Sequence, residues 1–514
     1  MVIYNPDPSA LMEAAARRGV RLTLAEAELL ADLGRGTFDG CQRLGTVEAH
    51  ELDARHPRTA GSRPRSEDNP HNAWVWRCEV AGAPDGILSG HEVALKDIIP
   101  VAGQPMTGGS VVLEGHAAVF DATVTTRVLD AGGRITGLAT TEDMCLSGAS
   151  VSAATGQVRN PRDVTRSAGG SSSGVAALIA SGAIDSGIGA DQGGSIRIPA
   201  SLCGVYGMKP TYGLVPYTGC APIDPSLDHL GPMSGTVEGL ARLLQAIAGF
   251  DDGLDPRQAG PTEPVDYLAA ARDDSASLRV GVLAEGFDRA GLSDVEVDRT
   301  VREVADRLGG LGHEVVLVSA PLHSSAMDVH GALLLQGAAQ HMIGNGGVGP
   351  IGKGFYDERI GLVGSAGLEQ RGDSLFASVK FAAAVGGYLW DKFGGAYYAR
   401  AQNVAQAMRR QYDALFEDVD VLLMPTTCIQ APTLPDSTVP DLPSVELALS
   451  PALISNTCAF NHTGHPALSV PVPGPSGLPV GVMLVGAQFD ESTLLRVAHD
   501  LERAGLTLTT RRDR

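Results

Sequence analysis

The chain has 514 residues, of which 44% are hydrophobic and 19% charged, proportions typical of globular proteins. Its formal net charge of −20 excludes the basic surface that nucleic acids and anionic membranes attract, so we expect neither as a partner. The sequence contains no signal-like opening and no apolar run of the ~20 residues that a membrane helix needs. The seven cysteines are scattered without a CxxC pair, which favours reduced thiols in a cytoplasmic protein.

The first part of the chain is predicted to be helical. The run "SALMEAAARRG" starts at Ser9 and stops at a glycine, and "TLAEAELLADL" places Glu26 three residues after Thr23, a capping-box pattern. The polar run "HPRTAGSRPRSEDNPHN" that follows is interpreted as a linker. We therefore expect a helical extension over residues 1–65 and the main domain over 66–514. The extension is either a stabilising cap or a dimerisation element, and we favour a homodimer.

Beyond about residue 74, short apolar runs alternate with helical stretches, a rhythm that predicts an α/β fold. The region from about 286 to 400 is richer in helix and holds the loop "GNGGVGPIGKG", interpreted as a lid or one side of a substrate pocket. Strands are predicted at "EVALKDI", "LRVGVLAEG", "HEVVLVSA", "DVDVLLMPTT" and "ALSVPV", and helices at "SSSGVAALIASG" and "DVEVDRTVREVADRLGGLG".

Two segments rich in small residues, "GGSSSG" and "DQGGSIR", lie close together in the sequence. The first contains G-x-S-x-G with Ser172 at its centre, but the polar, Pro161-bearing stretch before it lacks the apolar strand that a nucleophile elbow needs. A phosphate-binding loop is excluded because no Gly-Lys-Ser/Thr follows. The glycines instead mark loop-to-helix junctions, where backbone N–H groups are available to an anion or a developing oxyanion. Two glycines before Ser195 allow close backbone approach.

A serine nucleophile needs a base, and none of the thirteen histidines lies in a recognisable triad motif. His462 and His465 are close in sequence but lack further ligands for a metal, so we interpret both as structural and expect no metal. The alternative base is Lys96, at the end of an apolar run. From the residues alone, a buried base and a lysine that reaches solvent are equally compatible with that position.

Three segments taken together, "ALKDIIPVAGQPMTGGS", "GGSSSG" and "DQGGSIRIPA", resemble the signature of the amidase signature family of serine hydrolases. Ser195 follows Ser171 by 24 residues, the spacing that the family keeps. The likeness extends from about residue 75 to the end, through "CGVYGMKPTYGLVPYTG", "DVLLMPT" and "NHTGHPALSVPV". The chain departs from the usual pattern at Ser173, where a glycine is common. The "DQGGSIRIPA" form and the helical extension look most like the broad-specificity and enantioselective amidases of nitrile-degrading actinobacteria.

This resemblance implies an α/β fold in which helices cover both faces of a large mixed β-sheet (α/β/α). It also implies a catalytic triad: Ser195 is the nucleophile, Ser171 is the bridging serine after a cis peptide bond, and Lys96 is the base. Lys96 must be neutral to accept a proton, although the ordinary pKa of lysine is about 10.4. Burial among apolar residues lowers that pKa, because it removes water from the charged form.

Further residues carry roles by the same resemblance. The N–H groups of Gln192, Gly193, Gly194 and the nucleophile hold the oxyanion, and Cys145 and Leu146 line the acyl pocket.

Three other residues, Ser172, Asp191 and Arg197, are implied to hold the catalytic loops in place. A rival hypothesis makes Cys145 a nitrilase-type nucleophile, but the serine apparatus is complete without it.

The implied activity is hydrolysis of the C–N bond of a small carboxamide to a carboxylate and ammonia, without a cofactor. Cleavage of a related anilide, carbamate or hydrazide stays open. The glutaminase subunit of a tRNA amidotransferase is a different class, opposed by the helical extension and Gln192. A catalytically silent scaffold is opposed by the retention of Lys96, Ser171 and Ser195.

Overall fold

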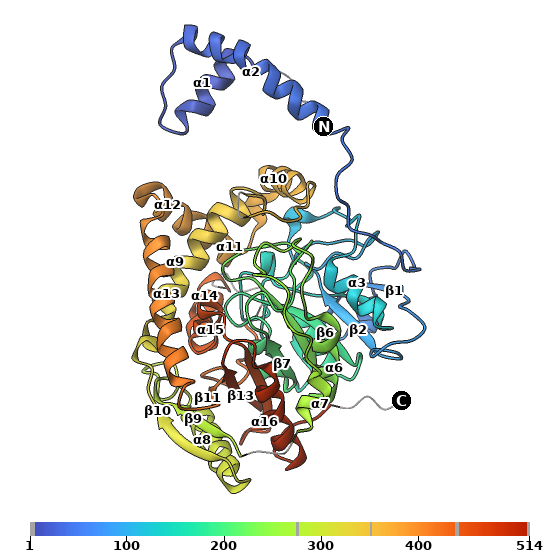
Figure 1. The fold of residues 1–514 in the computed structure, drawn as a ribbon, viewed down its shortest axis with the longest axis vertical. Coiled ribbons are helices and arrows are strands. Elements are labelled where there is room, and N and C mark those ends of the chain that lie inside the picture. Colours follow the sequence, from blue (N-terminus) through green and yellow to red (C-terminus); the bar gives the residue numbers. More distant parts are fainter. Residues whose placement is uncertain (1–5, 274–276, 350–351, 437–441, 511–514) are drawn as a thin grey trace. The chain divides into compact units, whose positions relative to one another are not determined.

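The computed structural model describes residues 6–273, 277–349, 352–436 and 442–510 (Figure 1). The chain divides into two compact units, Met1–Glu51 and Leu52–Arg514. None of the helices in the described residues is long and apolar enough to cross a membrane.

The first unit contains α1 (Pro8–Ala16) and α2 (Leu24–Leu44). The predicted start of α1 at Ser9 is wrong, because the side chain of Asp7 accepts the Ala10 N–H at 2.8 Å and Pro8, with φ fixed near helical values, opens the helix. The capping box between Thr23 and Glu26 is present with both hydrogen bonds.

The second unit begins at Leu52, so residues 52–65, which were predicted to belong to the extension, are part of it. Ser62 pairs with Arg77 of β1, and Arg58 forms an ion pair with Asp121 at 2.7 Å. Loop residues 52–65 therefore join the main domain through backbone pairing and a largely buried ion pair.

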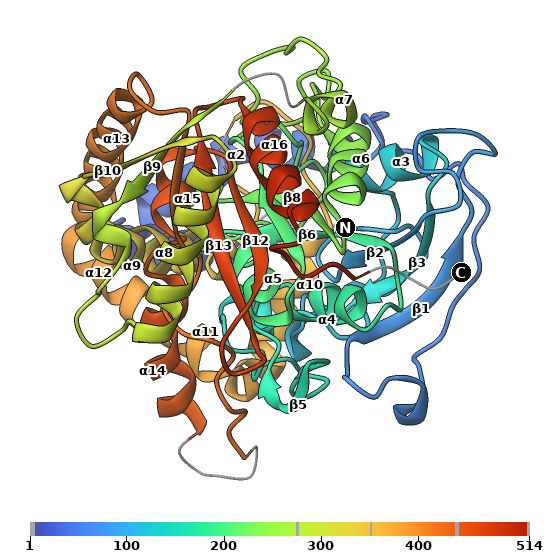
Figure 2. The same cartoon turned by 90° about the horizontal axis from the view of Figure 1, so that it is seen from below.

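A mixed sheet of eleven strands runs through the described part of the second unit, in the order β1-β3-β2-β6-β8-β7-β12-β13-β11-β9-β10 (Figure 2). Strand β2 is parallel to β3 and β6, and β11 is parallel to β9, whereas the strands between β6 and β11 pair antiparallel. The strands are β1 (Trp74–Val80), β2 (Glu92–Lys96), β3 (Arg134–Ala139), β6 (Ser186–Asp191), β7 (Tyr206–Lys209), β8 (His229–Ser234), β9 (Arg279–Leu283), β10 (Glu314–Val318), β11 (Val421–Pro425), β12 (Ala467–Pro473) and β13 (Pro479–Gly486), and the short pair β4 (Arg159–Asn160) and β5 (Asp163–Ser167) forms a separate sheet.

Helices cover both faces of this sheet, which confirms the predicted α/β/α arrangement. All the strands and helices predicted from the sequence of this unit are present. The helices are α3 (Thr123–Asp130), α4 (Ser173–Ala180), α5 (Arg197–Cys203), α6 (Val237–Ile247), α7 (Tyr267–Ala271), α8 (Val295–Gly310), α9 (Ala326–Gly337), α10 (Ile360–Arg371), α11 (Ala377–Phe381), α12 (Gly387–Phe393), α13 (Ala396–Leu415), α14 (Leu442–Ile454), α15 (Ala459–Thr463) and α16 (Glu491–Arg503).

The alternation of side chains along β2 assigns its residues to the two faces. Val93 and Leu95 belong to the large core that includes the inner residues of α6 and α16. Ala94, between them, belongs to a second core built from residues of α4 and α5. Because Lys96 is two residues beyond Ala94, it faces the same side as α4 and α5, the two helices that follow the small-residue loops.

Candidate active site

Lys96 is fully buried at the end of β2. Its Nζ donates to Ser171 Oγ at 2.7 Å and approaches the Ala190 carbonyl at 3.4 Å. Burial lowers the pKa of Lys96, although the neighbouring Cys145, Asp191 and Glu142 act in the opposite direction. The alternative in which this lysine reaches solvent is therefore excluded. The lowered pKa favours the neutral form of the amine.

The loop before α4 carries the serine that the lysine contacts. The Gly170–Ser171 peptide bond is cis, and the Ser171 carbonyl accepts a hydrogen bond from Thr141 Oγ1 at 2.8 Å. Ser173, the residue that departs from the family pattern, also donates to the Ser171 carbonyl, at 3.5 Å. Both contacts hold the Ser171 carbonyl, on the C-terminal side of that residue.

Ser172, the centre of the G-x-S-x-G match, is fully buried and turned toward β6. Its Oγ donates to the Ala190 carbonyl and accepts the Ala190 N–H, both at 3.2 Å. Its own N–H donates to the Ser195 carbonyl at 3.1 Å. Ser172 thus ties the two small-residue loops together, as a loop-holding residue does, and its hydroxyl does not face the cavity described below.

Ser195 lies in the loop between β6 and α5 and lines a cavity. The two preceding glycines are sterically required. Gly194 has φ of +143°, and a Cβ there would collide with Thr457 and Ile198. A Cβ on Gly193 would come within 2.6 Å of the His330 ring. In the described chain the N–H groups of Gly193, Gly194 and Ser195 take no part in backbone hydrogen bonds, which leaves them as donors for an oxyanion.

A buried ion pair anchors this loop. Arg197 Nη2 lies 2.9 Å from Asp191 Oδ1, and both side chains are completely inaccessible to solvent. Burial alone would raise the pKa of Asp191, but the charge and hydrogen bonds of Arg197 outweigh it and hold that pKa well below its usual range. Arg197 also donates to the Thr457 carbonyl at 2.8 Å and to Asn461 Oδ1 at 2.8 Å. The pair therefore stays ionised and locks the loop to α15.

Two residues that hold this loop were not predicted from the sequence. Asn461 donates to the Asp191 carbonyl at 2.9 Å and to its carboxylate at 2.8 Å. Thr457 donates to the Gly193 carbonyl at 2.5 Å. The only signal in the sequence was the segment "NHTGHPALSV", which opens with Asn461.

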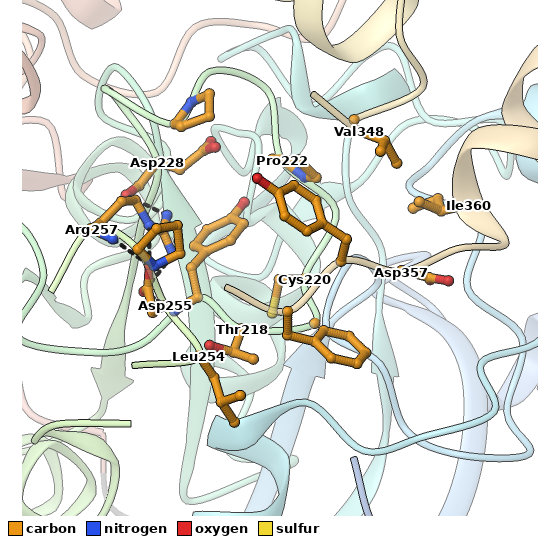
Figure 3. Close-up of a pocket in the computed structure, with 17 residues that line it drawn as sticks. Thr218, Cys220, Pro222, Asp228, Leu254, Asp255, Arg257, Val348, Asp357 and Ile360 are labelled. Atoms are coloured by element: carbon orange, nitrogen blue, oxygen red, sulfur yellow. Dashed lines mark hydrogen bonds and ion pairs between the residues drawn. The ribbon is translucent and has the colours of Figure 1, made fainter. Parts of the chain in front are cut away.

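Gln192 is held from behind by groups that no local pattern indicated. Its amide Nε2 donates to Asp228 Oδ1 at 2.9 Å and to the Tyr217 hydroxyl at 3.2 Å. Figure 3 shows Asp228 beside the ion pair of Arg257 and Asp255, around a separate cavity of about 70 Å³. Pockets for organic ligands measure about 300–1,000 Å³, so this second cavity is too small to be a substrate pocket. Two of the residues that line it, Asp228 and Tyr217, hold the Gln192 side chain.

The cavity at Ser195 is larger, about 360 Å³. Cys145 and Leu146 line it, as the resemblance implied, and Met327 and His330 of α9 close one side. Its lining in the described chain is mainly apolar and includes no Asp, Glu, Lys or Arg. None of the described residues of the glycine-rich loop lines it. Gly347 and Val348 line the smaller cavity, and residues 350 and 351 of that loop lie outside the described residues.

The comparisons with known proteins identify the class. Residues 59–495 match the family model described as Amidase, so the chain belongs to the Amidase family and is an enzyme that hydrolyses amide bonds. It is 43% identical over 446 residues to an enantioselective amidase of Rhodococcus rhodochrous, covering 86% of this chain and 85% of the relative.

Two further matches show how widely the family ranges. A glutamyl-tRNA(Gln) amidotransferase subunit of Synechococcus is 36% identical over 84% of this chain and 86% of that protein. The solved structure of a peptide amidase of Stenotrophomonas maltophilia superposes with a TM-score of 0.66 at 27% identity, covering 84% of this chain and 85% of that one. The family therefore settles the fold and the type of bond, whereas the substrate has to be argued from the cavity.

The anchoring role of the buried ion pair predicts a large effect of Asp191→Asn. The substitution leaves the Arg197 guanidinium buried without a counter-charge, so the free energy of unfolding should fall by about 3–5 kcal/mol. Urea unfolding followed by circular dichroism measures it. Glu296→Gln is the matched control, since it breaks an exposed carboxylate–arginine pair with Arg299 and should hardly move the midpoint. Equal midpoints for the two variants would contradict the anchoring role.

Proposed function

We propose that the protein hydrolyses small, uncharged carboxamides through an acyl-enzyme on Ser195, with Ser171 as proton relay and Lys96 as base. The observation that carries this proposal is the 2.7 Å contact between a fully buried lysine amine and the Ser171 hydroxyl. Ser195, 8% exposed, is reachable from the cavity, whereas Lys96 and Ser171 are at 0%. Because Lys96 and Ser171 are both buried, a proton that reaches the Ser171 hydroxyl is passed to the amine without going through bulk water.

The reaction follows from this arrangement. Ser195 Oγ attacks the amide carbonyl, and its proton passes through Ser171 to the neutral amine of Lys96. The N–H groups of Gln192, Gly193, Gly194 and Ser195 stabilise the oxyanion. The C–N bond then breaks as the same proton returns through Ser171 to the leaving nitrogen, and ammonia departs. Water hydrolyses the ester by the same relay and restores both serines.

The assignment of the nucleophile predicts that Ser195→Ala abolishes turnover of every amide. A fluorophosphonate should label the wild-type enzyme on the peptide that contains Ser195, as read by mass spectrometry, and should not label the variant. Lys96→Ala should fold normally, yet it should slow acylation by about 10²–10⁴-fold, because proton transfer to a positioned base is lost.

Ser172→Ala is the matched control for the labelling, because its hydroxyl is bonded to the backbone of Ala190. This variant should still take up the reagent at Ser195. An adduct on Ser172 in the wild-type protein, or normal turnover by Ser195→Ala, would contradict the assignment of Ser195 as the nucleophile.

The lining of the cavity supports a proposal for the class of acyl group. A charged group buried there would lose its hydration without gaining an ionic partner, because the lining of the described chain contains no charged side chain. Apolar acyl groups are favoured by contact with Met327, Leu334 and Ile454. This argues for the amidase class of relative over the amidotransferase subunit, whose name points to glutamine chemistry.

A panel of amides tests this substrate class. Pentanamide has the chain length of glutamine without its two charges, so kcat/KM measured by ammonia release should be at least ~100-fold higher for pentanamide. Anilides, carbamates and hydrazides with the same acyl group complete the panel and decide among the leaving groups. A preference for glutamine would reject the apolar-acyl proposal while leaving the Ser195 chemistry intact.

The proposal also covers assembly and compartment: a homodimer formed through the first unit, acting in the cytoplasm. The leucines at positions 29, 30 and 33 of α2 lie within one side of the helix and are exposed in the single chain. All seven cysteines are free thiols, as a reducing compartment favours.

The double variant Leu30→Glu/Leu33→Glu should shift the full-length protein from dimer to monomer, because charges are costly in an apolar interface. Light scattering coupled to size-exclusion chromatography measures the mass. Gln42→Glu, an exposed position on another side of α2, should remain dimeric. A monomeric wild-type protein, or a dimer unaffected by the leucine changes, would rule out this interface.

A further inference from the structure

A second group of reactive side chains lies beside the Ser195 cavity and has no part in the proposed mechanism. Three ligand atoms, one from each of His330, Cys458 and His462, lie within 4.8 Å of one another. Cys458 is fully buried, His330 is 4% exposed and His462 is partly buried. Cysteine and histidine are the ligands that zinc and copper(I) prefer in proteins.

The local structure explains why these residues meet. Cys458 is the residue before α15, and His462 follows four positions later, so the two side chains lie on one side of a helical turn. His330 comes from α9, which packs against α15. From the sequence we expected no metal at His462, because no further ligands were recognised. One of the two other donors, His330, is 132 residues away in the chain.

The separations suit a small cation. Nδ1 of His330 and Nε2 of His462 are 3.2 Å apart. In a tetrahedral zinc site two imidazole nitrogens are about 3.3 Å apart, and a nitrogen and a thiolate sulfur about 3.6 Å apart. The widest pair in the cluster therefore has to close by only about 1 Å. The second ring nitrogen of His462, Nδ1, is buried without a hydrogen-bond partner in the described structure.

A fourth donor and an entry path are also present. Met327 Sδ lies 3.9 Å from Cys458 Sγ, one turn before His330 on α9. Met327 and His330 both line the cavity at Ser195, so a cation can reach the cluster from there. Two histidines, one cysteine and a more distant methionine form a set of soft donors, which disfavours magnesium and calcium.

We propose that His330, Cys458 and His462 form a binding site for one thiophilic cation, Zn²⁺ or Cu⁺, at the edge of the substrate cavity. Coordination replaces the Cys458 S–H bond with a metal–thiolate bond, and the proton leaves to solvent. His330 and His462 contribute one nitrogen each, and the fourth position is open to water or to Met327.

The bound cation regulates the enzyme, an inference that rests on the proposed function. The His330 ring packs so closely on Gly193 that a single methyl group there would collide with it. A cation that pulls His330 toward Cys458 moves the ring that supports the oxyanion loop, and it also occupies the edge of the acyl cavity. The site is therefore inhibitory.

Binding is tested on the full-length protein without any substrate. Zn²⁺ is titrated in competition with a chromophoric chelator, and Co²⁺ is used to read thiolate coordination from its charge-transfer absorption. The expected result is one Zn²⁺ per chain, bound at least about tenfold more weakly by Cys458→Ser and by His462→Gln. Cys428→Ser, a buried cysteine outside the cluster, is the matched control and should bind like the wild type.

Unchanged Zn²⁺ affinity in both Cys458→Ser and His462→Gln, or no binding of either ion, would overturn the site and leave the cluster as a hydrogen-bonded pair of imidazoles beside a thiol. The Cu⁺ titration, run under anaerobic reducing conditions, distinguishes the ions. Met327→Leu should weaken Cu⁺ binding and leave Zn²⁺ binding unchanged, since a thioether is a good ligand only for the softer ion.

The regulatory inference has its own readout. Zn²⁺ should suppress amide hydrolysis by the wild type and by Cys428→Ser, and a chelator should restore it. Cys458→Ser should keep its basal activity and be at least about tenfold less sensitive to Zn²⁺. Binding without inhibition would reject the regulatory role alone, and absence of amidase activity would reject the proposed function without touching the binding result.

Discussion

The burial of one lysine amine is the constraint on which the rest of the site depends. Among the described residues, Lys96 forms no ion pair with a carboxylate, and its amine lies against the Ser171 hydroxyl, the Ala190 carbonyl and the Cys145 thiol. Loss of hydration favours the neutral amine, because the charged form has no strong compensation in this position. In the mechanism we propose, the neutral amine accepts a proton that Ser171 delivers. A lysine exposed to water would stay charged at neutral pH and could not act in this way.

The position of that amine follows from the sheet. Strand β2 lies inside a parallel group with β3 and β6, so its residues are covered on both faces. Alternation along the strand turns Lys96 toward the loops before α4 and α5, where the two serines lie. Leu95, one position earlier on the strand, faces the opposite core.

The second electrostatic element of the site has the opposite character. Asp191 and Arg197 are buried with their charges retained, because each neutralises the other and Asn461 satisfies further hydrogen bonds. Removing one partner leaves a buried charge without a counter-charge, which costs far more free energy of folding than having no charged pair there at all. The pair is therefore a rigid support. A lysine whose pKa is lowered by burial and an ionised Asp–Arg pair thus lie in one buried region, and the difference between them is the presence of a counter-charge.

Local chemistry within the sequence determined much of this protein. The apolar runs set the strands, the capping box set the start of α2, and the spacing of glycines and serines together with the family resemblance singled out Lys96, Ser171 and Ser195. Contacts between distant segments were decided only by the tertiary structure. Gln192 meets Asp228 because the ends of the paired strands β6 and β8 lie side by side. Arg197 meets Asn461, and His330 meets Cys458 and His462, because α9 and α15 pack around the loop. A sequence pattern reports the neighbours of a residue along the chain, whereas burial, counter-charge and coordination depend on neighbours in space.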